Sequence, residues 1–375
     1  MQRGFLVLCI ALGVSLGTPA SAQAPAALRT RNVVLIVTDG LRWQEVFRGA
    51  ERSLMSARPG GVRDTSALIS DFWRPTPEER RETLLPFFWG TIAKNGQIFG
   101  NQDRGSVATI TNPMRFSYPG YNEIFTGAFD PRIDSNDYPP NPNETVLEWI
   151  AGRPGFAGRV GAVATWNAFR RILNAERSGM TVLDGWNPPF ANVRAPSAAQ
   201  RLIDELYRTS VQLWAENSFD APMHLAAKEY IRTARPRLVF VGYGETDEWA
   251  HSGMYDMVLR SAHQVDAFIA DLWNAMQAMP QYRGSTTFVI TTDHGRGSGA
   301  DAWRDHGAKV EGAENIWLAV LGPDTPPLGE RGAGAAMTQS QIAATVAALL
   351  GEDWNGRNAS AGPALRAALS VAGEH

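Results

Sequence analysis

Residues 32–40 read NVVLIVTDG, an apolar run of strand length that ends in an acidic residue, Asp39, and a glycine. The run does not alternate between apolar and polar residues, which is typical of a central parallel strand covered on both faces. Four more runs have the same character, at 159–165, 237–243, 287–292 and 316–321. We expect the five runs to be strands of one sheet.

Helical patterns separate these strands, and they lie at 198–216, 222–234, 254–279 and 339–350. Strands that alternate with helices predict an α/β fold with a mostly parallel central sheet and helices on both faces. In such sheets, ligands bind at the carboxyl ends of the strands. This rule points to Asp39, Asp247 and Asp293, because each follows a predicted strand.

The first residues are predicted to be an export signal. Arg3 precedes an apolar run at 5–16 that is too short to span a membrane, and small residues up to Ala22 form a cleavage motif. We therefore divide the chain into a signal peptide, 1–22, and a single domain, 23–375, delivered to the periplasm or the medium. A membrane anchor is the alternative reading of the same segment.

Charge excludes one class of partner. The chain has 35 basic and 38 acidic residues, and loss of Arg3 with the signal would leave 34 basic residues and a net charge of −4. A nucleic-acid-binding protein needs a basic face, so no nucleic acid is expected as a structural partner. Separately from the charge, no membrane partner is expected. Residues 48–100, rich in Arg, Pro and aromatic residues, interrupt the alternation. We interpret them as an insertion, which either shapes access to a site or is a surface segment without a functional role. The oligomeric state stays open.

Three further motifs carry metal-ligand chemistry. Asp247 and His251 are four residues apart and share one face of a helical turn, so both can bind one ion. Asp293 and His294 close a predicted strand beside a glycine, and His306 lies in a second Asp-His-Gly sequence. Each motif is common alone, but with the Asp that ends the first strand they supply the ligands of a two-metal site for phosphoryl transfer.

Residues 115–127, RFSYPGYNEIFTG, supply a hydroxyl. Ser117 precedes a run that can be helical and that ends in Gly127. The positive end of a helix dipole lowers the cost of an alkoxide and leaves N–H groups that face an anion. Ser117 is therefore the predicted nucleophile, and Thr111 is its nearby competitor.

In this order of motifs the chain resembles the alkaline phosphatase superfamily, and most of all its nucleotide pyrophosphatase/phosphodiesterase branch. The resemblance covers most of the chain, including the helical run at 339–351. It implies one metal ion on Asp39, Asp293, His294 and the Ser117 oxygen, and a second on Asp247, His251 and His306. The share of His ligands favours Zn²⁺ over Mg²⁺ or Ca²⁺, with Mn²⁺ or mixed occupancy as alternatives.

The sequence departs from that branch at the nucleophile. Relatives carry Thr there with Asn three residues on, whereas Gly120 occupies that place here. Asn136 is the candidate to contact the phosphoryl oxygens instead, and a role in a turn is its alternative. Arg170 or Arg171 would add the cation that favours a monoester if either pointed inward. In a sulfatase motif an Arg would stand where this chain has Tyr121.

The resulting prediction is a secreted two-zinc hydrolase of small phosphate esters, diester or monoester, that works through a phosphoseryl intermediate. A sulfatase-like hydrolase, and a phospho-group transferase or mutase of the same superfamily, are alternatives. From a different class, the chain would be a metal-stabilised binding protein without turnover. The natural ester is left open.

Overall fold

Strand β1, Asn32–Thr38, lies inside an eight-stranded sheet with the order β5-β4-β6-β1-β7-β8-β2-β9. The computed structural model describes residues 27–369, so the predicted signal peptide lies outside the described residues. In the register of the sheet, Val34 stands between Val239 of β6 and Phe288 of β7. The five predicted strands are all present, and the expected α/β fold is confirmed.

The sheet is parallel over its larger part and reverses near one edge. β1 pairs in parallel with β6 (Leu238–Tyr243) and β7 (Thr286–Thr291), and the parallel run continues from β6 to β4 (Val160–Ala164) and β5 (Thr181–Asp184). β8, Leu318–Leu321, runs antiparallel to β7, and β2, Gln97–Phe99, runs antiparallel to β8. The short β9, Gly329–Glu330, closes this edge parallel to β2.

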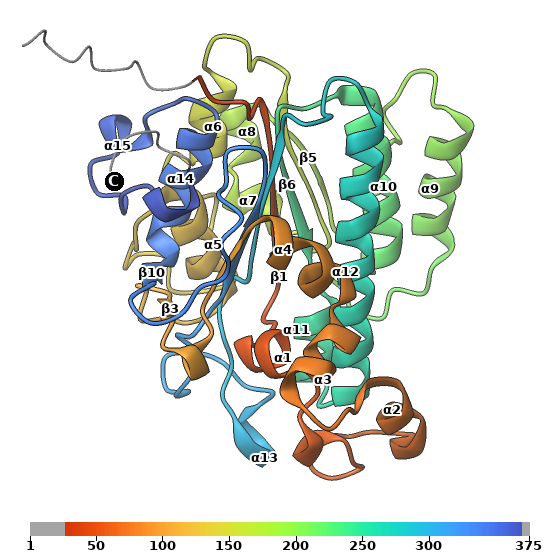
Figure 1. Cartoon of the computed structure of the whole chain (residues 1–375). Coiled ribbons are helices and arrows are strands. Elements are labelled where there is room, and N and C mark those ends of the chain that lie inside the picture. The colour runs from red at the N-terminus through yellow and green to blue at the C-terminus, as the bar shows by residue number, and fades with distance from the viewer. Residues whose placement is uncertain (1–26, 370–375) are drawn as a thin grey trace, which may run out of the picture. The chain divides into compact units, whose positions relative to one another are not determined.

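Both faces of β1 are buried, which explains its unbroken apolar sequence. Val34 and Ile36 belong to one hydrophobic cluster, whereas Val33, Leu35 and Val37 belong to a second on the opposite face. Helices cover each face of the sheet (Figure 1). The first cluster packs under α1 (Trp43–Arg48), α10 (Asp220–Ala234) and α12 (Tyr255–Ala278); the second packs under α5 (Ser117–Thr126), α6 (Val146–Ala151) and α14 (Ile342–Leu349).

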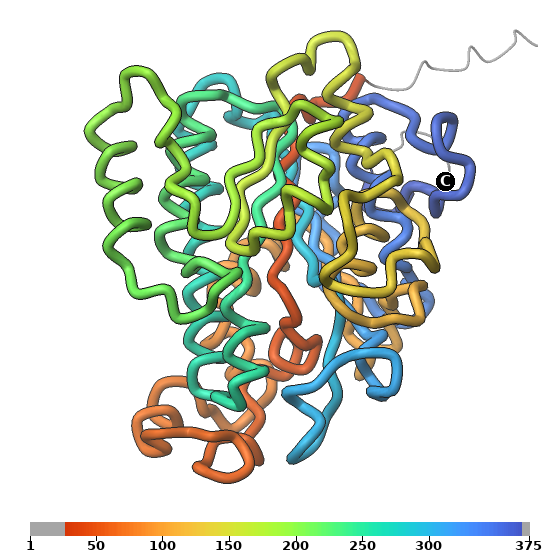
Figure 2. Tube along the Cα trace, turned by 180° about the vertical axis from the view of Figure 1, so that it is seen from behind, coloured from red at the N-terminus to blue at the C-terminus, as the bar shows by residue number. Residues whose placement is uncertain are grey.

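One helix is shorter than predicted. The pattern at 198–216 forms α9, Ala198–Thr209, which ends where Ser210 takes an extended conformation. α9 lies outside α10 in both views of the chain (Figures 1 and 2). Residues 210–217 instead return toward the sheet as a loop, where Asn217 forms a β-bridge with Trp166. We call residues 210–217 the wall loop.

The segment at 48–100 is mainly helical and ends in the sheet. It contains α2 (Thr65–Phe72), α3 (Pro77–Leu84), a π-helical turn at Phe88–Ile92, and then β2. α3 begins with a capping box, because the Thr76 and Glu79 side chains each bind the other's backbone N–H. The end of the expected insertion is thus part of the main sheet.

The carboxyl ends of β1, β6 and β7 point toward the region of α1, α11 (Glu245–His251) and α13 (Gly299–Ala302), at the bottom of Figure 1. Most of the predicted site residues follow these strands. Within residues 27–369, no helix combines the length and the apolar character needed to cross a membrane.

Candidate metal centre

The first ligand group forms where the neighbouring strands β1 and β7 end. His294 Nε2 lies 3.5 Å from Asp39 Oδ1, 3.5 Å from Asp293 Oδ2 and 3.3 Å from Ser117 Oγ. Those two carboxylate oxygens are buried, and neither has a hydrogen-bond partner among the described residues. Two unpaired oxygens, a ring nitrogen and a hydroxyl thus converge, as the donors of a divalent cation do. We call Asp39, Asp293 and His294 the inner group.

Burial controls the electrostatics of the inner group. Loss of water raises the pKa of Asp39 to about 8, and the neighbouring charge of Asp293 adds to this effect. Burial likewise raises the pKa of Asp293 to about 7 and lowers the pKa of His294. The protein therefore does not itself compensate the charge of these carboxylates fully, and a bound cation would do so.

Several hydrogen bonds orient the inner ligands. The Tyr121 hydroxyl donates to Asp39 Oδ2 over 3.0 Å, and the Gly40 N–H donates to Asp293 Oδ1 over 3.1 Å. His294 Nδ1 lies 3.0 Å from the Gly295 carbonyl oxygen, which can only accept, so Nδ1 carries the proton. The Nε2 lone pair of His294 is then free to bind a metal.

The second group lies on α11 and on the loop after α13. His251 Nε2 is 3.1 Å from Asp247 Oδ2 and 2.9 Å from His306 Nε2. His306 Nδ1 faces the Arg115 carbonyl oxygen over 3.2 Å, so its Nε2 also presents a lone pair. Its ring stacks on His294 with centroids 4.0 Å apart, and burial lowers its pKa. We call Asp247, His251 and His306 the outer group.

Arg296 is a buried cation beside the outer group, and the sequence prediction missed it. Its Nη2 contacts Asp247 Oδ1, and its Nε donates to the Gly40 carbonyl oxygen over 3.2 Å. Burial lowers its pKa to about 9. The signal was present, because this Arg comes directly after the Asp-His-Gly sequence at the end of β7.

Ser117 is the first residue of α5, and its hydroxyl is the one brought to the inner group. α5 can approach closely because residue 120 is Gly: a Cβ there would lie 2.5 Å from the Asp293 carbonyl oxygen. Thr111 is directed elsewhere, since its hydroxyl donates to the buried Glu123 over 2.8 Å. Asn136 Oδ1 accepts from the N–H of Tyr118 over 3.0 Å, so Asn136 stands beside the start of α5.

A cavity of about 490 Å³ opens over Ser117 and Asn136 and reaches ligands from both groups. Its other walls come from Trp166, Glu248 and the wall loop. No Lys or Arg is among the described residues that line it. Arg170 pairs instead with Asp184, and Arg171 donates to the Asn136 backbone oxygen over 3.2 Å.

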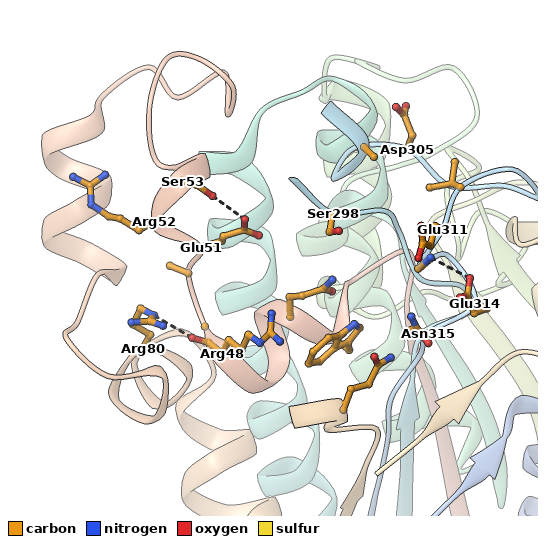
Figure 3. A pocket seen from close by; sticks show the side chains of 18 of the residues that line it. Arg48, Glu51, Arg52, Ser53, Arg80, Ser298, Asp305, Glu311, Glu314 and Asn315 are labelled. Carbon is orange, nitrogen blue, oxygen red and sulfur yellow. Dashed lines mark hydrogen bonds between the residues drawn. The ribbon is translucent and has the colours of Figure 1, made fainter. Parts of the chain in front are cut away.

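The segment at 48–100 lines a different cavity, of about 910 Å³ (Figure 3). Arg48, Arg52 and Arg80 approach it from one side, and the loop at 298–315 approaches from the other. Arg80 Nε donates to the Arg48 carbonyl oxygen over 3.1 Å. None of this segment lines the cavity over Ser117.

The fold is that of the alkaline phosphatase superfamily, as the resemblance predicts. A phosphonate monoester hydrolase from Silicibacter pomeroyi is 14% identical, with a TM-score of 0.54 over 91% of this chain and 77% of that one. A putative sulfatase from Bacteroides thetaiotaomicron is 13% identical, with a TM-score of 0.56 over 92% of this chain and 76% of that one. At these identities, the likeness concerns the fold alone.

The family follows from the sequence itself. Residues 106–313, more than half of the chain, match the model of the type I phosphodiesterase / nucleotide pyrophosphatase family. The chain therefore belongs to this family, and it is a hydrolase of the superfamily. No curated protein matches the chain. Every predicted ligand except Asp39 falls within the matched residues.

Proposed function

We propose that this protein is a metal-dependent phosphodiesterase in which Ser117 is the nucleophile. The observation that carries the proposal is the convergence of the Ser117 hydroxyl with unpaired donors of the inner group, inside a cavity. The inner and outer groups would hold two divalent ions, expected to be Zn²⁺, which would stabilise the charge on the attacking and leaving oxygens. The proposal includes export and removal of residues 1–22.

Ser117 would act in two displacements. Its Oγ loses its proton and attacks phosphorus as the bond from phosphorus to the leaving alcohol oxygen breaks and that oxygen takes up a proton, which gives a free alcohol and a Ser117 that carries the remaining half of the diester as an alkyl phosphate. A water oxygen then attacks phosphorus, the bond to Oγ breaks, and the phosphate monoester leaves. The position at the start of α5 supports this role, because the helix dipole favours negative charge on Oγ.

Asn136 would orient the phosphoryl group. The bond from the Tyr118 N–H occupies its Oδ1, which leaves the Nδ2 group as a donor at the edge of the cavity. An amide donor suits the single charge of a diester, whereas the second charge of a monoester calls for a Lys or Arg. The cavity lining offers neither, and Arg170 is engaged by Asp184. We therefore favour diesters over monoesters.

Ser117→Ala tests the nucleophile. Turnover of a chromogenic phosphodiester should fall by at least about 10³-fold, because water lacks the positioning of a tethered hydroxyl. The variant should keep its fold and most of its metal, because five of the six Asp and His ligands do not contact Ser117 in the structure. Acid quenching of the wild type during turnover should trap the remaining phosphate ester group of the substrate on the peptide that contains Ser117.

Two further variants serve as controls for this test. Thr111→Ala should retain turnover, because its hydroxyl binds Glu123 and not the ligand groups. Ser117→Thr should retain part of the activity, because it keeps a hydroxyl. Near-wild-type turnover in Ser117→Ala together with an inactive Thr111→Ala would overturn the assignment.

A further inference from the structure

The wall of the cavity that faces Ser117 has an unusual chemical composition. It combines two indoles, Trp166 and Trp214, with two carboxylates, Glu216 and Glu248, and the amide of Asn217. Trp214, Glu216 and Asn217 come from the wall loop, Trp166 follows β4, and Glu248 lies on α11. Three separate parts of the fold therefore converge on this wall.

The wall's own donors fix both carboxylates. Trp166 Nε1 donates to Glu216 Oε2 over 3.2 Å, and Asn217 Nδ2 donates to Glu248 Oε1 over 2.6 Å. Each carboxylate thus has one oxygen that no described residue contacts by a hydrogen bond. Neither carboxylate forms an ion pair with a Lys or Arg among the described residues. The wall therefore keeps two negative charges.

The two charges are close enough to influence one another. The pKa of Glu248 is raised chiefly by burial, and the charge of Glu216 raises it further. The bond from Asn217 and the nearby His251 oppose this shift. Glu216 itself is exposed, so salt screens its part of the field.

Such a wall would discriminate among phosphodiesters by the charge of the group esterified to the phosphate. An anionic group, such as a second phosphate, would meet two like charges at this wall, and no Lys or Arg lines the cavity to offset them. A cationic group is attracted by the carboxylates, and it also gains from contact with an indole. An uncharged group of the same shape gains only the apolar contact.

We propose that this cavity selects phosphodiesters whose alcohol carries a positive charge, an amine or a quaternary ammonium, and that Glu216 and Glu248 determine this preference. The inference rests on the proposed phosphodiesterase function and narrows it to one substrate class. It separates this chain from an enzyme for nucleotide pyrophosphates, whose esterified groups carry further negative charge.

The test uses two esters that differ by one atom. The p-nitrophenyl phosphodiester of choline has a quaternary nitrogen, and that of 3,3-dimethylbutanol has carbon in its place. We expect wild-type kcat/KM to be about 10-fold higher for the choline ester, from charge attraction and contact with the indoles. The ratio should fall as ionic strength rises.

Glu216→Gln/Glu248→Gln should bring this ratio close to one. Glu311→Gln is the matched control, because it removes a carboxylate that lines the other cavity, and the ratio should stay at the wild-type value. A wild-type ratio near or below one, with the neutral ester turned over, would overturn the charge preference and leave the phosphodiesterase proposal intact.

If neither ester is hydrolysed, the proposed phosphodiesterase function is wrong. A binding measurement then still tests the preference for a cationic group. Choline should quench indole fluorescence at lower concentration than 3,3-dimethylbutanol, because Trp166 and Trp214 line the cavity. The double Gln variant should lose that difference. Equal quenching by choline and the alcohol in the wild type would overturn the inference without reference to turnover.

Discussion

The inner and outer groups use similar side chains in contrasting surroundings. Asp293 and His294 are completely buried, whereas the His251 side chain is 46% exposed. The inner ligands follow two adjacent strands, so sheet hydrogen bonds fix the spacing of their backbones. The outer ligands lie on a seven-residue helix and on a loop, and a buried Arg contacts one of them.

This contrast implies that the two groups would bind their metal ions with different affinities. Because the inner group concentrates two buried carboxylates whose pKa values are raised, a cation there gains most from electrostatics. The charge of Arg296 acts on Asp39 as well, but Arg296 contacts Asp247 of the outer group directly, so a second cation there meets direct repulsion and open solvent. We expect the inner ion to bind first and tightest, and the outer ion to exchange readily.

Loss of the inner group should have the largest effect. The wild type should hold two ions per chain, and Asp293→Asn should keep at most one. Its phosphodiester turnover should fall by at least about 10⁴-fold, because the substitution removes a charge that would bind the ion and that, like Ser117, lies beside His294. Elemental analysis and turnover on the same sample give both values. Two ions retained in active Asp293→Asn would contradict the assignment of this group.

Loss of an outer ligand should have a smaller and more selective effect. His251→Asn should weaken the second ion by at least about 10²-fold and leave the first bound, because His251 contacts only outer residues. Titration against a competing chelator resolves the two affinities. His263→Asn is the control, since His263 Nδ1 faces the Leu84 carbonyl oxygen and contacts neither group. Loss of both ions in His251→Asn would show that the two groups are not separable.

Removal of the buried Arg296 guanidinium should have the smallest effect, and it should strengthen the binding of the second ion and not weaken it. Arg296→Met keeps much of the buried volume and removes the charge at Asp247, so the second ion should bind about 10-fold more tightly. The same chelator titration measures this change, and the first affinity should move less. Weaker binding of the second ion would mean that Arg296 holds Asp247 in place more than it repels a cation.

The sequence predicted the parts of the site that strands control. A buried parallel strand has a recognisable apolar run, and an acidic residue at its end, such as Asp39 or Asp293, has few places to point. The direction of β8 was not readable, because an apolar run has the same composition in either direction. For the same reason, the pattern of apolar runs predicts only that the sheet is mostly parallel, and it does not show which strands run antiparallel.

Three errors or omissions have a common origin in tertiary contacts. The helical pattern at 198–216 is interrupted after Thr209, where Ser210 takes an extended conformation and the chain returns to pair Asn217 with Trp166, beyond the end of β4. The Asp-His-Gly-Arg sequence does not show that Arg296 is buried, because its burial depends on contacts with Asp247 and Gly40. His224, which belongs to none of the sequence motifs, is buried and lies 3.1 Å from the Tyr243 hydroxyl. Each depends on a partner far away in the chain.

Main-chain bonds attach the end of the wall loop to the residues that directly follow β4. The Asn167 N–H donates to the Glu216 carbonyl oxygen over 3.0 Å, and the Ser218 N–H donates to the Thr165 carbonyl oxygen over 2.9 Å. These bonds use backbone atoms only and do not depend on the side chains of the loop. Substitutions in the wall loop can therefore accumulate without loss of the fold or of the inner and outer groups. During evolution, proteins with this loop can therefore change the esters that they accept as substrates while their catalytic chemistry stays the same.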